Sequence, residues 1–497
     1  MKFHILIFGC QMNYSDGARI KAILLNCGFS YTDNITQADI VIFDTCSVKQ
    51  KAEDKITGKL KEIGKHQKIW ITGCMIQHNL RNSKINKDSK FKIGNFMGSL
   101  KTQSPQIIGF TTDEINESNT SILRDGNIVG VNHAFNPLFY NLIQKRKNIE
   151  LFFRIDDIGF LPLILPKIGY KIKYDSEIIN EYEKIIPNGI NTSMNSHSST
   201  AYVPVSTGCN QFCAYCIVPY ARGLEKNFSV QQIVNEARSH IKNGAKEIVL
   251  IGQIVNKHPE FIQIIKEILK IEGLEWLKYT SPYPTFYSAE LLELHQQESK
   301  LCPHIHMPLQ SGSDDILKKM FRGYDSSQFK QFVDNIHKLS RSISITTDVI
   351  IGFPGETEKE FKETLDLVEY ARFDMIYMGI YSTRPGTIAE RKYPDDIPYK
   401  VKHARWSKLN NLLKKISLEN NQKEIGSIKQ VLINEIKNDG NNETMKHGNI
   451  IGYTDNMKQI ILKPSKSVKI GDIATVKITD GKSFKLYGEI TVLKTKD

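Results

Sequence analysis

The sequence lacks any apolar stretch long enough to cross a membrane as a helix, which takes about 18 or more consecutive apolar residues. Its N-terminal stretch, MKFHILIFGC, is apolar, but it has neither the basic n-region nor the small-residue cleavage site of a secretory signal peptide. We therefore interpret this stretch as a buried strand. These absences predict a cytosolic protein with no membrane contact.

Cysteine is scarce, with eight in 497 residues. A cytosolic chain of this size uses cysteines more often as metal ligands or catalytic groups than in disulfides. Six of the eight lie where chain geometry suggests ligands. Cys27, inside a predicted helix, and Cys302, with no other cysteine nearby, are interpreted as structural residues.

Acidic residues are outnumbered, because 66 Lys and Arg against 54 Asp and Glu give a formal charge of +12. A positive excess suits a polyanionic partner such as nucleic acid. An AT-rich genome, which enriches Lys together with Asn and Ile, explains the same excess. Charge alone therefore leaves both interpretations open.

The N-terminal third alternates apolar strands with helices. We predict strands at 3–9, 38–45 and 68–73, and helices at 15–28, with Ser15 as N-cap, and at 51–66. This β-α-β-α-β order predicts a parallel sheet with right-handed crossovers. The near-continuous apolar runs are typical of strands covered on both faces.

One cysteine follows each of these strands: Cys10, Cys46 and Cys74. The carboxyl ends of parallel strands meet at the edge of a sheet where ligands bind. Three cysteines delivered to that edge predict a ligand site that no local motif reveals. Three unrelated buried cysteines are the alternative, because cysteine is often a small core residue.

From Tyr202 onward the chain again alternates strands and helices. The predicted strands lie at 201–206, 247–252, 274–281, 304–310, 344–352 and 374–382. The predicted helices lie at about 229–243, 258–271, 288–298, 313–339 (broken near Gly323) and 356–372, followed by a longer helix at about 400–424. Six β/α units predict a partial barrel whose active site lies at the C-terminal ends of its strands.

The loop after the first barrel strand, GCNQFCAYC, has three cysteines and no fourth ligand. Cys209, Cys213 and Cys216 have the spacing C-x3-C-x2-C, and no other Cys or His lies within the loop. Closed zinc sites and ferredoxin-type clusters both use four protein ligands. Three thiolates on a 4Fe-4S cluster would leave one iron open to a substrate or cofactor, and Tyr215 would suit stacking on a planar ligand.

The C-terminal region changes to short strands separated by turn residues. They are predicted at 427–436, 447–454, 459–465, 471–481 and 485–493. Five strands in about 70 residues predict a small OB-like β-barrel. Residues 427–497 contain 12 Lys against 8 acidic residues, which suits contacts to an RNA backbone. A structural cap on the central barrel is the alternative.

The triple-cysteine loop resembles that of the radical S-adenosylmethionine (SAM) enzymes, and in particular of their methylthiotransferase branch, over GCNQFCAYCIVPYARG (208–223). Further similarities are FGCQMNYSD (8–16), DTCSVKQKAEDK (44–55), TGCMIQ (72–77), LIGQIVN (250–256), CPHIHMPLQSGSDDILKKMFRGY (302–324), TTDVIIGFPGETE (346–358) and YSTRPGT (381–387). The likeness covers residues 1–81 and 149–497. TDGKSFKLYGE (479–489) is similar to the end of a TRAM domain, which implies RNA binding.

The resemblance implies two open 4Fe-4S clusters and SAM as cofactors. The cluster on the triple-cysteine loop would chelate SAM, whose cleavage gives a 5′-deoxyadenosyl radical that removes hydrogen from C2 of an adenine. A second, auxiliary cluster on Cys10, Cys46 and Cys74 would carry the sulfur that is inserted. A second SAM would then methylate that sulfur.

The resemblance also implies a SAM pocket at the ends of several barrel strands. Its residues would be Tyr215, Gln253, Gln310, Ser311, Gly312, Gly352, Phe353 and Pro354. Glycine there would let the backbone approach the adenine, and a turn requirement is the alternative. The stretch 384–386 either faces the substrate or forms a structural turn. Ile254 stands where family members often have Asn, which is a departure near the second strand.

The implied substrate is N6-dimethylallyladenosine beside the anticodon of tRNA, methylthiolated at C2. VPYARG and GQIVN favour it over threonylcarbamoyladenosine in tRNA, and VPY disfavours an aspartate of a ribosomal protein; both stay as alternatives. The implied partners are the tRNA anticodon stem-loop, an electron donor of flavodoxin or ferredoxin type, and a sulfur source. We expect a monomer.

Together these features predict an α/β protein in three parts. An N-terminal methylthiotransferase domain with the auxiliary cluster spans 1–195, a radical SAM core spans 196–424, and a TRAM RNA-binding domain spans 425–497. Residues from about 82 to 148 are rich in Lys, Asn, Ser and Ile. They interrupt the first part and are interpreted as an insertion.

Overall fold

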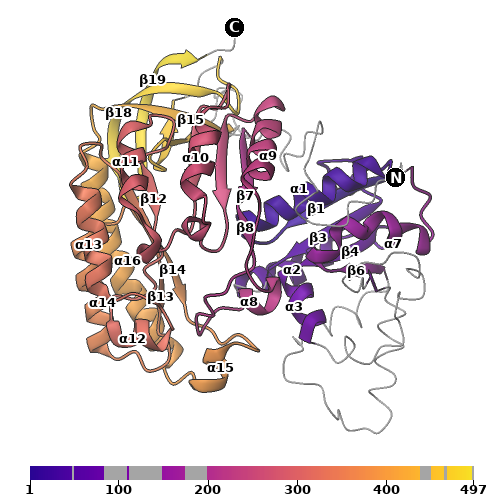
Figure 1. Ribbon diagram of the computed structural model, residues 1–497, viewed down its shortest axis with the longest axis horizontal. Helices are drawn as coiled ribbons and strands as arrows, with labels where there is room; N and C mark the ends of the chain where they lie inside the picture. The colour runs from indigo at the N-terminus through magenta and orange to yellow at the C-terminus, as the bar shows by residue number, and fades with distance from the viewer. Residues whose placement is uncertain are drawn as a thin grey trace, which may run out of the picture. The chain divides into compact units, whose positions relative to one another are not determined.

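The computed structural model describes residues 1–46, 50–82, 109–110, 148–173, 199–436, 449–463 and 467–494. The chain forms two compact units, and Figure 1 labels most of their helices and strands. Unit 1 consists of Met1–Ser196, Ser206–Ser239 and Arg384–Arg391, and unit 2 of His197–Val205, His240–Thr383 and Lys392–Asp497. The division into domains at 1–195, 196–424 and 425–497 stays a prediction. The predicted insertion at 82–148 lies almost entirely outside the described residues.

Unit 1 is built on a six-stranded sheet in the order β2-β1-β3-β4-β6-β5. Its strands are β1 (Lys2–Ile7), β2 (Ser30–Tyr31), β3 (Ile40–Thr45), β4 (Lys68–Gly73), β5 (Gly109–Phe110) and β6 (Ile149–Phe153). The pairs are parallel except β5 with β6. The accompanying helices are α1 (Gln11–Asn26), α2 (Gln50–Glu62), α3 (Cys74–Asn82) and α7 (Leu161–Lys167). The predicted N-terminal parallel sheet is confirmed.

Apolar side chains form a core on each face of this sheet. One core contains Phe3, Trp70 and Phe153, and the other contains Phe43 and Phe152. Phe152 and Phe153 belong to different cores because successive side chains of a strand point to opposite faces. The sheet is therefore buried on both sides, as its near-continuous apolar runs predict.

Helix α1 begins earlier than predicted. Its N-cap is Cys10 and not Ser15, and Asn13 Oδ1 accepts a hydrogen bond from the Cys10 backbone N–H at 3.1 Å. This contact has the geometry of a capping box, with Asn in the place of Glu or Gln. Ser15 lies buried inside the helix, where its hydroxyl accepts a hydrogen bond from Arg19 at 2.5 Å. Cys27, predicted inside the helix, is its C-cap residue and lies in the core.

Unit 2 contains six barrel strands as two three-stranded parallel sheets, in the orders β11-β10-β7 and β12-β13-β14. The strands are β7 (Thr200–Pro204), β10 (Glu247–Ile251), β11 (Trp276–Tyr279), β12 (His304–His306), β13 (Ser344–Ile351) and β14 (Met375–Ile380). A parallel bridge between Leu277 and Leu301 connects the two sheets. Leu277 is in β11, the edge strand of the first sheet, and Leu301 lies just before β12, the edge strand of the second. The predicted arrangement of six β/α units is confirmed.

Along the chain, helices connect successive strands, and Figure 1 labels these helices. They are α9 (Val230–Lys242), α10 (Phe261–Leu269), α11 (Ala289–Gln297), α12 (Asp314–Lys319), α13 (Ser326–His337) and α14 (Glu358–Ala371), and α16 (Tyr399–Gln422) follows the last strand. The gap between α12 and α13 falls at the predicted break near Gly323. No helix in the described part of the chain is long and apolar enough to cross a membrane.

The C-terminal strands close into a barrel in the order β15-β16-β17-β19-β18. They are β15 (Ile428–Ile436), β16 (Ile450–Thr454), β17 (Gln459–Leu462), β18 (Ile473–Lys482) and β19 (Lys485–Lys494). Aliphatic side chains such as Val431, Ile450 and Leu486 fill its interior. The predicted small β-barrel is confirmed, and its closure removes the free edges of the sheet.

The barrel packs against the rest of unit 2 through a small apolar cluster. Trp276 and Cys302 contact Leu432 and Ile473 of the barrel, and all four are buried. Cys302 is therefore a core residue that fastens two parts of the unit.

A buried ion pair also holds the barrel. Lys458 Nζ lies 3.0 Å from Asp374 Oδ1 and 3.3 Å from Glu424 Oε1. We expect Lys458→Met to lower the free energy of unfolding by about 2 to 3 kcal/mol, because it leaves the largely buried charge of Asp374 without this cation. Glu424 keeps Lys429, which lies 2.8 Å away. Denaturant unfolding of the full chain measures the loss.

The matched control is Lys463→Met, because Lys463 pairs with Glu489 on the surface of the same barrel. The side chains of this pair are 79% and 52% exposed, and such a pair contributes at most about 1 kcal/mol. Equal losses for the Lys458 and Lys463 variants would contradict a fastening role for the buried pair.

Candidate functional site

The sheet of unit 1 brings Cys10, Cys46 and Cys74 to one edge. They follow β1, β3 and β4, which are adjacent and parallel. Cys46 and Cys74 are buried and Cys10 is exposed. Burial raises the pKa of the Cys74 thiol most, Arg222 lowers it, and the charges of Cys46 and Cys10 raise it further. The Cys74 thiol is therefore within electrostatic reach of the other two cysteines.

Buried polar contacts hold the strand ends that carry these cysteines. Asn13 Nδ2 donates to Asp44 Oδ1 at 2.7 Å and to Thr45 O at 3.3 Å, while Asn13 Oδ1 accepts from the Cys10 backbone. Gly73 has a φ of +99°, and a Cβ there would lie 2.2 Å from Thr45 O. Only glycine suits that backbone and that space, so the end of β4 can pass close to β3.

A buried arginine reaches this cysteine set from a distant part of the sequence. Arg222 ends the short helix α8 (Val218–Arg222), and its Nε donates a hydrogen bond to Cys74 Sγ at 3.2 Å. Its Nη2 lies 2.5 Å from Asp16 Oδ2. Neither residue of this ion pair was predicted as a site residue. Both lie inside motifs that carry the family resemblance, VPYARG and FGCQMNYSD, but spacing does not reveal that they meet.

The triple-cysteine loop also belongs to unit 1. A short antiparallel pair, β8 (Ser206–Thr207) and β9 (Lys226–Asn227), closes the loop at its base. Gly208 has a φ of +72°, and a Cβ there would lie 2.1 Å from Leu224 O. The backbone just before Cys209 therefore lies against the backbone at Leu224, near the other end of the loop. Glycine is required at position 208 because a side chain would not fit there.

A turn lies between the second and third cysteines of the loop. Cys209 and Cys213 are buried and Cys216 is half-buried, and the Cys216 N–H donates to the Cys213 carbonyl at 2.9 Å. Phe212 has a φ of +48°, a left-handed conformation that is uncommon outside glycine. Tyr215 is half-buried, and its stacking on a bound cofactor stays a prediction.

Both cysteine sets suit an open iron–sulfur cluster by the chemistry of their donors. Each supplies three thiols, and thiolates are the usual ligands of such clusters. Within the described residues, no three Cys, His, Asp or Glu side chains converge as they would around a single metal ion. A 4Fe-4S cluster does not require that convergence, because each thiolate ligates a different iron. The two donor sets are therefore compatible with clusters of this kind.

Four of the residues predicted for SAM binding follow β10 and β12 in unit 2. Gln253 is half-buried just after β10. Gln310 has a φ of +67°, and its N–H donates to the backbone of β13 at 2.8 Å. Ser311 Oγ lies 3.3 Å from Thr364 Oγ1, and the Gly312 N–H donates to the same oxygen at 3.0 Å. This turn is thus tied to helix α14, and its part in SAM binding stays a prediction.

The other three, Gly352, Phe353 and Pro354, follow β13 in the same unit. Gly352 has a φ of +71°. The Phe353 side chain is fully buried and meets the rings of Tyr381 and Tyr393 edge-on. That side chain therefore packs in the core. Contact of these three residues with SAM stays a prediction.

The turn at 384–386 belongs to unit 1. The buried His78 of α3 forms a hydrogen bond with the Pro385 backbone; burial lowers the pKa of His78, and this bond opposes the shift. Thr387 Oγ1 donates to the Arg384 carbonyl at 2.8 Å. These contacts favour the structural-turn interpretation of the stretch, and its contact with a substrate stays a prediction.

A polar row that was not predicted crosses β12 and β13. His306 Nε2 lies 3.0 Å from Asp348 Oδ2, and His306 Nδ1 lies 3.0 Å from Thr346 Oγ1. His304 Nε2 lies 2.9 Å from the same hydroxyl. Alternate residues of a strand share a face. The sequence HIH within a predicted strand could therefore have predicted that the two histidine rings lie on the same face.

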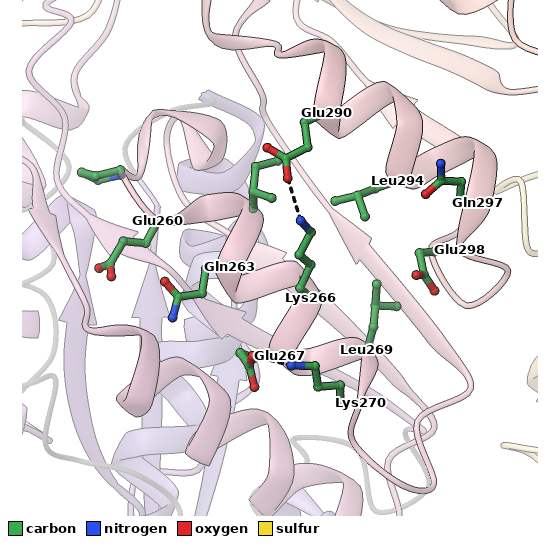
Figure 2. A pocket seen from close by; sticks show the side chains of 12 residues that line it. Glu260, Gln263, Lys266, Glu267, Leu269, Lys270, Glu290, Leu294, Gln297 and Glu298 are labelled. Carbon is green, nitrogen blue, oxygen red and sulfur yellow. Dashed lines mark hydrogen bonds and ion pairs between the residues drawn. The ribbon is translucent and has the colours of Figure 1, made fainter.

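Figure 2 shows a surface pocket between α10 and α11 of unit 2. The ion pair between Lys266 and Glu290, 2.6 Å long, crosses it. The side chains of this pair are about half exposed, and none of the predicted site residues lines the pocket. Its chemistry is that of a solvated charged surface.

Three family models match the chain. The radical SAM superfamily matches residues 203–368, the TRAM domain matches residues 422–491, and the uncharacterized protein family UPF0004 matches residues 2–94. The first two confirm the predicted resemblance of the central and C-terminal regions. The third covers the strands that carry Cys10, Cys46 and Cys74.

Curated relatives match almost the whole chain. The tRNA-2-methylthio-N(6)-dimethylallyladenosine synthase of Thermoanaerobacter sp. (strain X514) is 33% identical, over 98% of this chain and 92% of the relative. Proteins of the same name from Natranaerobius thermophilus and Fusobacterium nucleatum are each 32% identical, over 98% of this chain and 96% and 99% of the relatives. The chain belongs to this synthase family.

Membership of the family confirms the predicted methylthiotransferase resemblance. The radical SAM domain implies a 4Fe-4S cluster and SAM as cofactors. Among solved structures, the radical SAM methyltransferase TsrM from Kitasatospora setae has a TM-score of 0.44 and 12% identity, over 78% of this chain and 75% of that chain. This likeness is too weak to inform the function.

A buried carboxyl group beneath the Gly352 turn predicts a pH dependence. Glu356 Oε2 accepts from the Gly352 N–H at 2.9 Å and from Arg405 Nη1 at 3.0 Å. Burial raises the pKa of Glu356 from 4.5 to about 7, although both partners oppose the shift. The folded state therefore holds the proton more tightly than the unfolded state. The stability that this proton contributes is present below the unfolded pKa and is lost as pH rises through about 7.

We expect the difference in unfolding free energy between Glu356→Gln and the wild type to change with pH, because glutamine never ionises. From pH 5 to pH 8 it should shift in favour of the variant by about 2 to 3 kcal/mol. Unfolding free energies at several pH values measure the difference. The control is Glu358→Gln, since Glu358 also pairs with Arg405, at 2.9 Å, but its side chain is 64% exposed. A difference between Glu356→Gln and wild type that does not change with pH would contradict the raised pKa.

Proposed function

We propose that this chain is a radical SAM methylthiotransferase that adds a methylthio group to C2 of N6-dimethylallyladenosine beside the anticodon of tRNA. Relatives of that name match nearly their full length. The observation that carries the proposal is the presence of two separate three-cysteine sets within one compact unit. One set lies on a single loop, and the other is assembled from three strand ends.

In this proposal Cys209, Cys213 and Cys216 hold one open 4Fe-4S cluster, and the strand-end set holds a second. When bound, such clusters with SAM supply radical chemistry at an unactivated carbon and the sulfur to be inserted. The chain's own contribution is to hold each set of thiols with a vacant fourth position. Gly208 and the closed base of the loop shape the first set, and the parallel strands shape the second.

SAM itself would be held by the residues after the barrel strands. We assign this role to Tyr215, Gln253, Gln310, Ser311, Gly312, Gly352, Phe353 and Pro354. Of the assigned residues that follow β10, β12 and β13, Gln253 is half-buried and the others are buried. Its polar side chain is therefore suited to bind a polar group of SAM. At Gly352 a Cβ would lie 2.4 Å from the Lys402 side chain, so this glycine allows a close approach to the backbone.

The substrate would be the tRNA anticodon stem-loop, for which the TRAM match and the closed C-terminal barrel give support. Exposed lysines on that barrel, such as Lys463 and Lys482, suit contacts to phosphates. We further propose an electron donor of flavodoxin or ferredoxin type, a sulfur source, and a monomeric enzyme. We also propose a cytoplasmic location, because the cytoplasm holds tRNA and keeps thiols reduced.

We expect Cys74→Ala to abolish the 2-methylthio product while leaving cleavage of SAM to 5′-deoxyadenosine, because the triple-cysteine loop is intact. Nucleoside mass spectrometry of tRNA from cells that carry only the variant gene measures the first effect. Anaerobic assay of the purified protein measures the second. The matched control is Cys27→Ala, a buried cysteine in the same unit, which should keep both activities.

Accumulation of N6-dimethylallyladenosine in the Cys74 variant would support the assigned substrate. If the variant still methylthiolates RNA, the requirement for a second set of thiols is wrong. If threonylcarbamoyladenosine is the nucleoside whose methylthio form disappears, the reaction class stands and the substrate assignment is wrong.

A further inference from the structure

Arg222 lies in the buried interior of unit 1 with only 4% of its surface exposed. Taking a guanidinium out of water is costly unless its donors are matched by acceptors. Asp16, which is fully buried, supplies one carboxylate partner 2.5 Å from Nη2. This contact alone forms an ion pair. The arginine also donates a hydrogen bond to a second residue, Cys74.

The second contact is the hydrogen bond from Nε to Cys74 Sγ, 3.2 Å long. A neutral thiol is only a weak acceptor, whereas a thiolate accepts a charge-assisted hydrogen bond from a guanidinium. The geometry is therefore suited to a Cys74 sulfur that carries negative charge, as an iron ligand does. Asp16 fixes the orientation of the guanidinium from its other side.

The arginine also belongs to the segment that follows the other cysteine set. Gly223, the residue after Arg222, accepts a hydrogen bond from the Cys209 N–H at 3.1 Å through its carbonyl. Helix α8 packs on α3, which begins at Cys74. One short stretch of backbone thus ties the triple-cysteine loop to a cysteine of the strand-end set.

We propose that Arg222 is a positioning residue for Cys74, which orients its sulfur and sets the reduction potential of the cluster held by the strand-end set. The inference rests on the proposed function, because it presupposes that cluster. Hydrogen bonds and positive charge at a ligand sulfur stabilise the more negative, reduced state of a cluster. Arg222 therefore raises the reduction potential, and the carboxylate of Asp16 moderates this effect.

The experiment uses the full chain with Cys209, Cys213 and Cys216 changed to Ala, so that only the strand-end set can load a cluster. After anaerobic reconstitution, iron and sulfide are counted and the midpoint potential is measured by redox titration followed by electron paramagnetic resonance. We expect Arg222→Gln to shift the midpoint to a more negative potential. We expect Asp16→Asn to shift it in the opposite direction, because the positive charge is then less balanced.

The matched control is Arg19→Gln, made in the same background. Arg19 lies on the same helix as Asp16, is 1% exposed, and forms a buried ion pair with Glu236 at 2.9 Å. Its loss likewise removes the arginine partner of a buried carboxylate, but the hydrogen bonds of Arg19 to Ser15 and Glu236 involve no cysteine. The potential of this variant should match that of the background.

An Arg222→Gln midpoint equal to that of Arg19→Gln, at equal iron content, would overturn the inference and leave the proposed function standing. Equal loss of iron in both variants would also overturn it, because the role would then be structural only. If Arg222→Gln does not fold, Arg222→Lys and Asp16→Asn supply the test: lysine should keep the iron with a smaller shift, and an unmoved potential in both overturns the inference. A background chain that binds no cluster contradicts the proposed function itself.

Discussion

Parallel pairing of β1, β3 and β4 decides where the strand-end set of cysteines lies. Because the three strands are neighbours that run in one direction, their carboxyl ends share one edge of the sheet. Each strand is followed closely by a cysteine, so pairing of the strands also brings the three thiols to one edge. An antiparallel neighbour would have sent one of the cysteines to the opposite edge.

The thiols at this edge are surrounded by buried polar groups that a purely apolar sheet would not need. Asn13 links the turn at Cys10 to the end of β3, and Asp16 and Arg222 form a buried ion pair beside Cys74. Burial raises the pKa of Asp44 well above its usual range, and the nearby Asp16 adds to this. Such groups are costly to bury without partners. Their presence is reasonable where thiolates and a cluster add negative charge and further hydrogen-bond acceptors.

Much of the fold could be predicted from the sequence, because apolar runs of strand length alternate with helical segments in both halves. The six barrel strands and the five strands of the C-terminal barrel were found at nearly their observed positions for this reason. The start of α1 was missed because Cys10 is not a residue that usually caps a helix. The structure shows that Asn13 completes the cap.

The candidate site was predictable to the extent that it depends on strand ends and on one short loop. Both cysteine sets follow from those local patterns. The ion pair of Arg222 with Asp16 does not, because 206 positions of sequence separate the two residues and no periodicity relates them. The row of His304 and His306 was missed for a similar reason, since its acceptors are on the neighbouring strand.

Counting iron and sulfide in anaerobically reconstituted chains tests the central claim, which is that the protein holds two separate clusters on three thiols each. The account predicts about eight iron atoms for the wild type, and about four for each variant in which one set of three cysteines is changed to Ala. With both sets changed, no cluster should form. A wild type that holds only about four iron atoms, all lost with the triple-cysteine loop, would contradict the account.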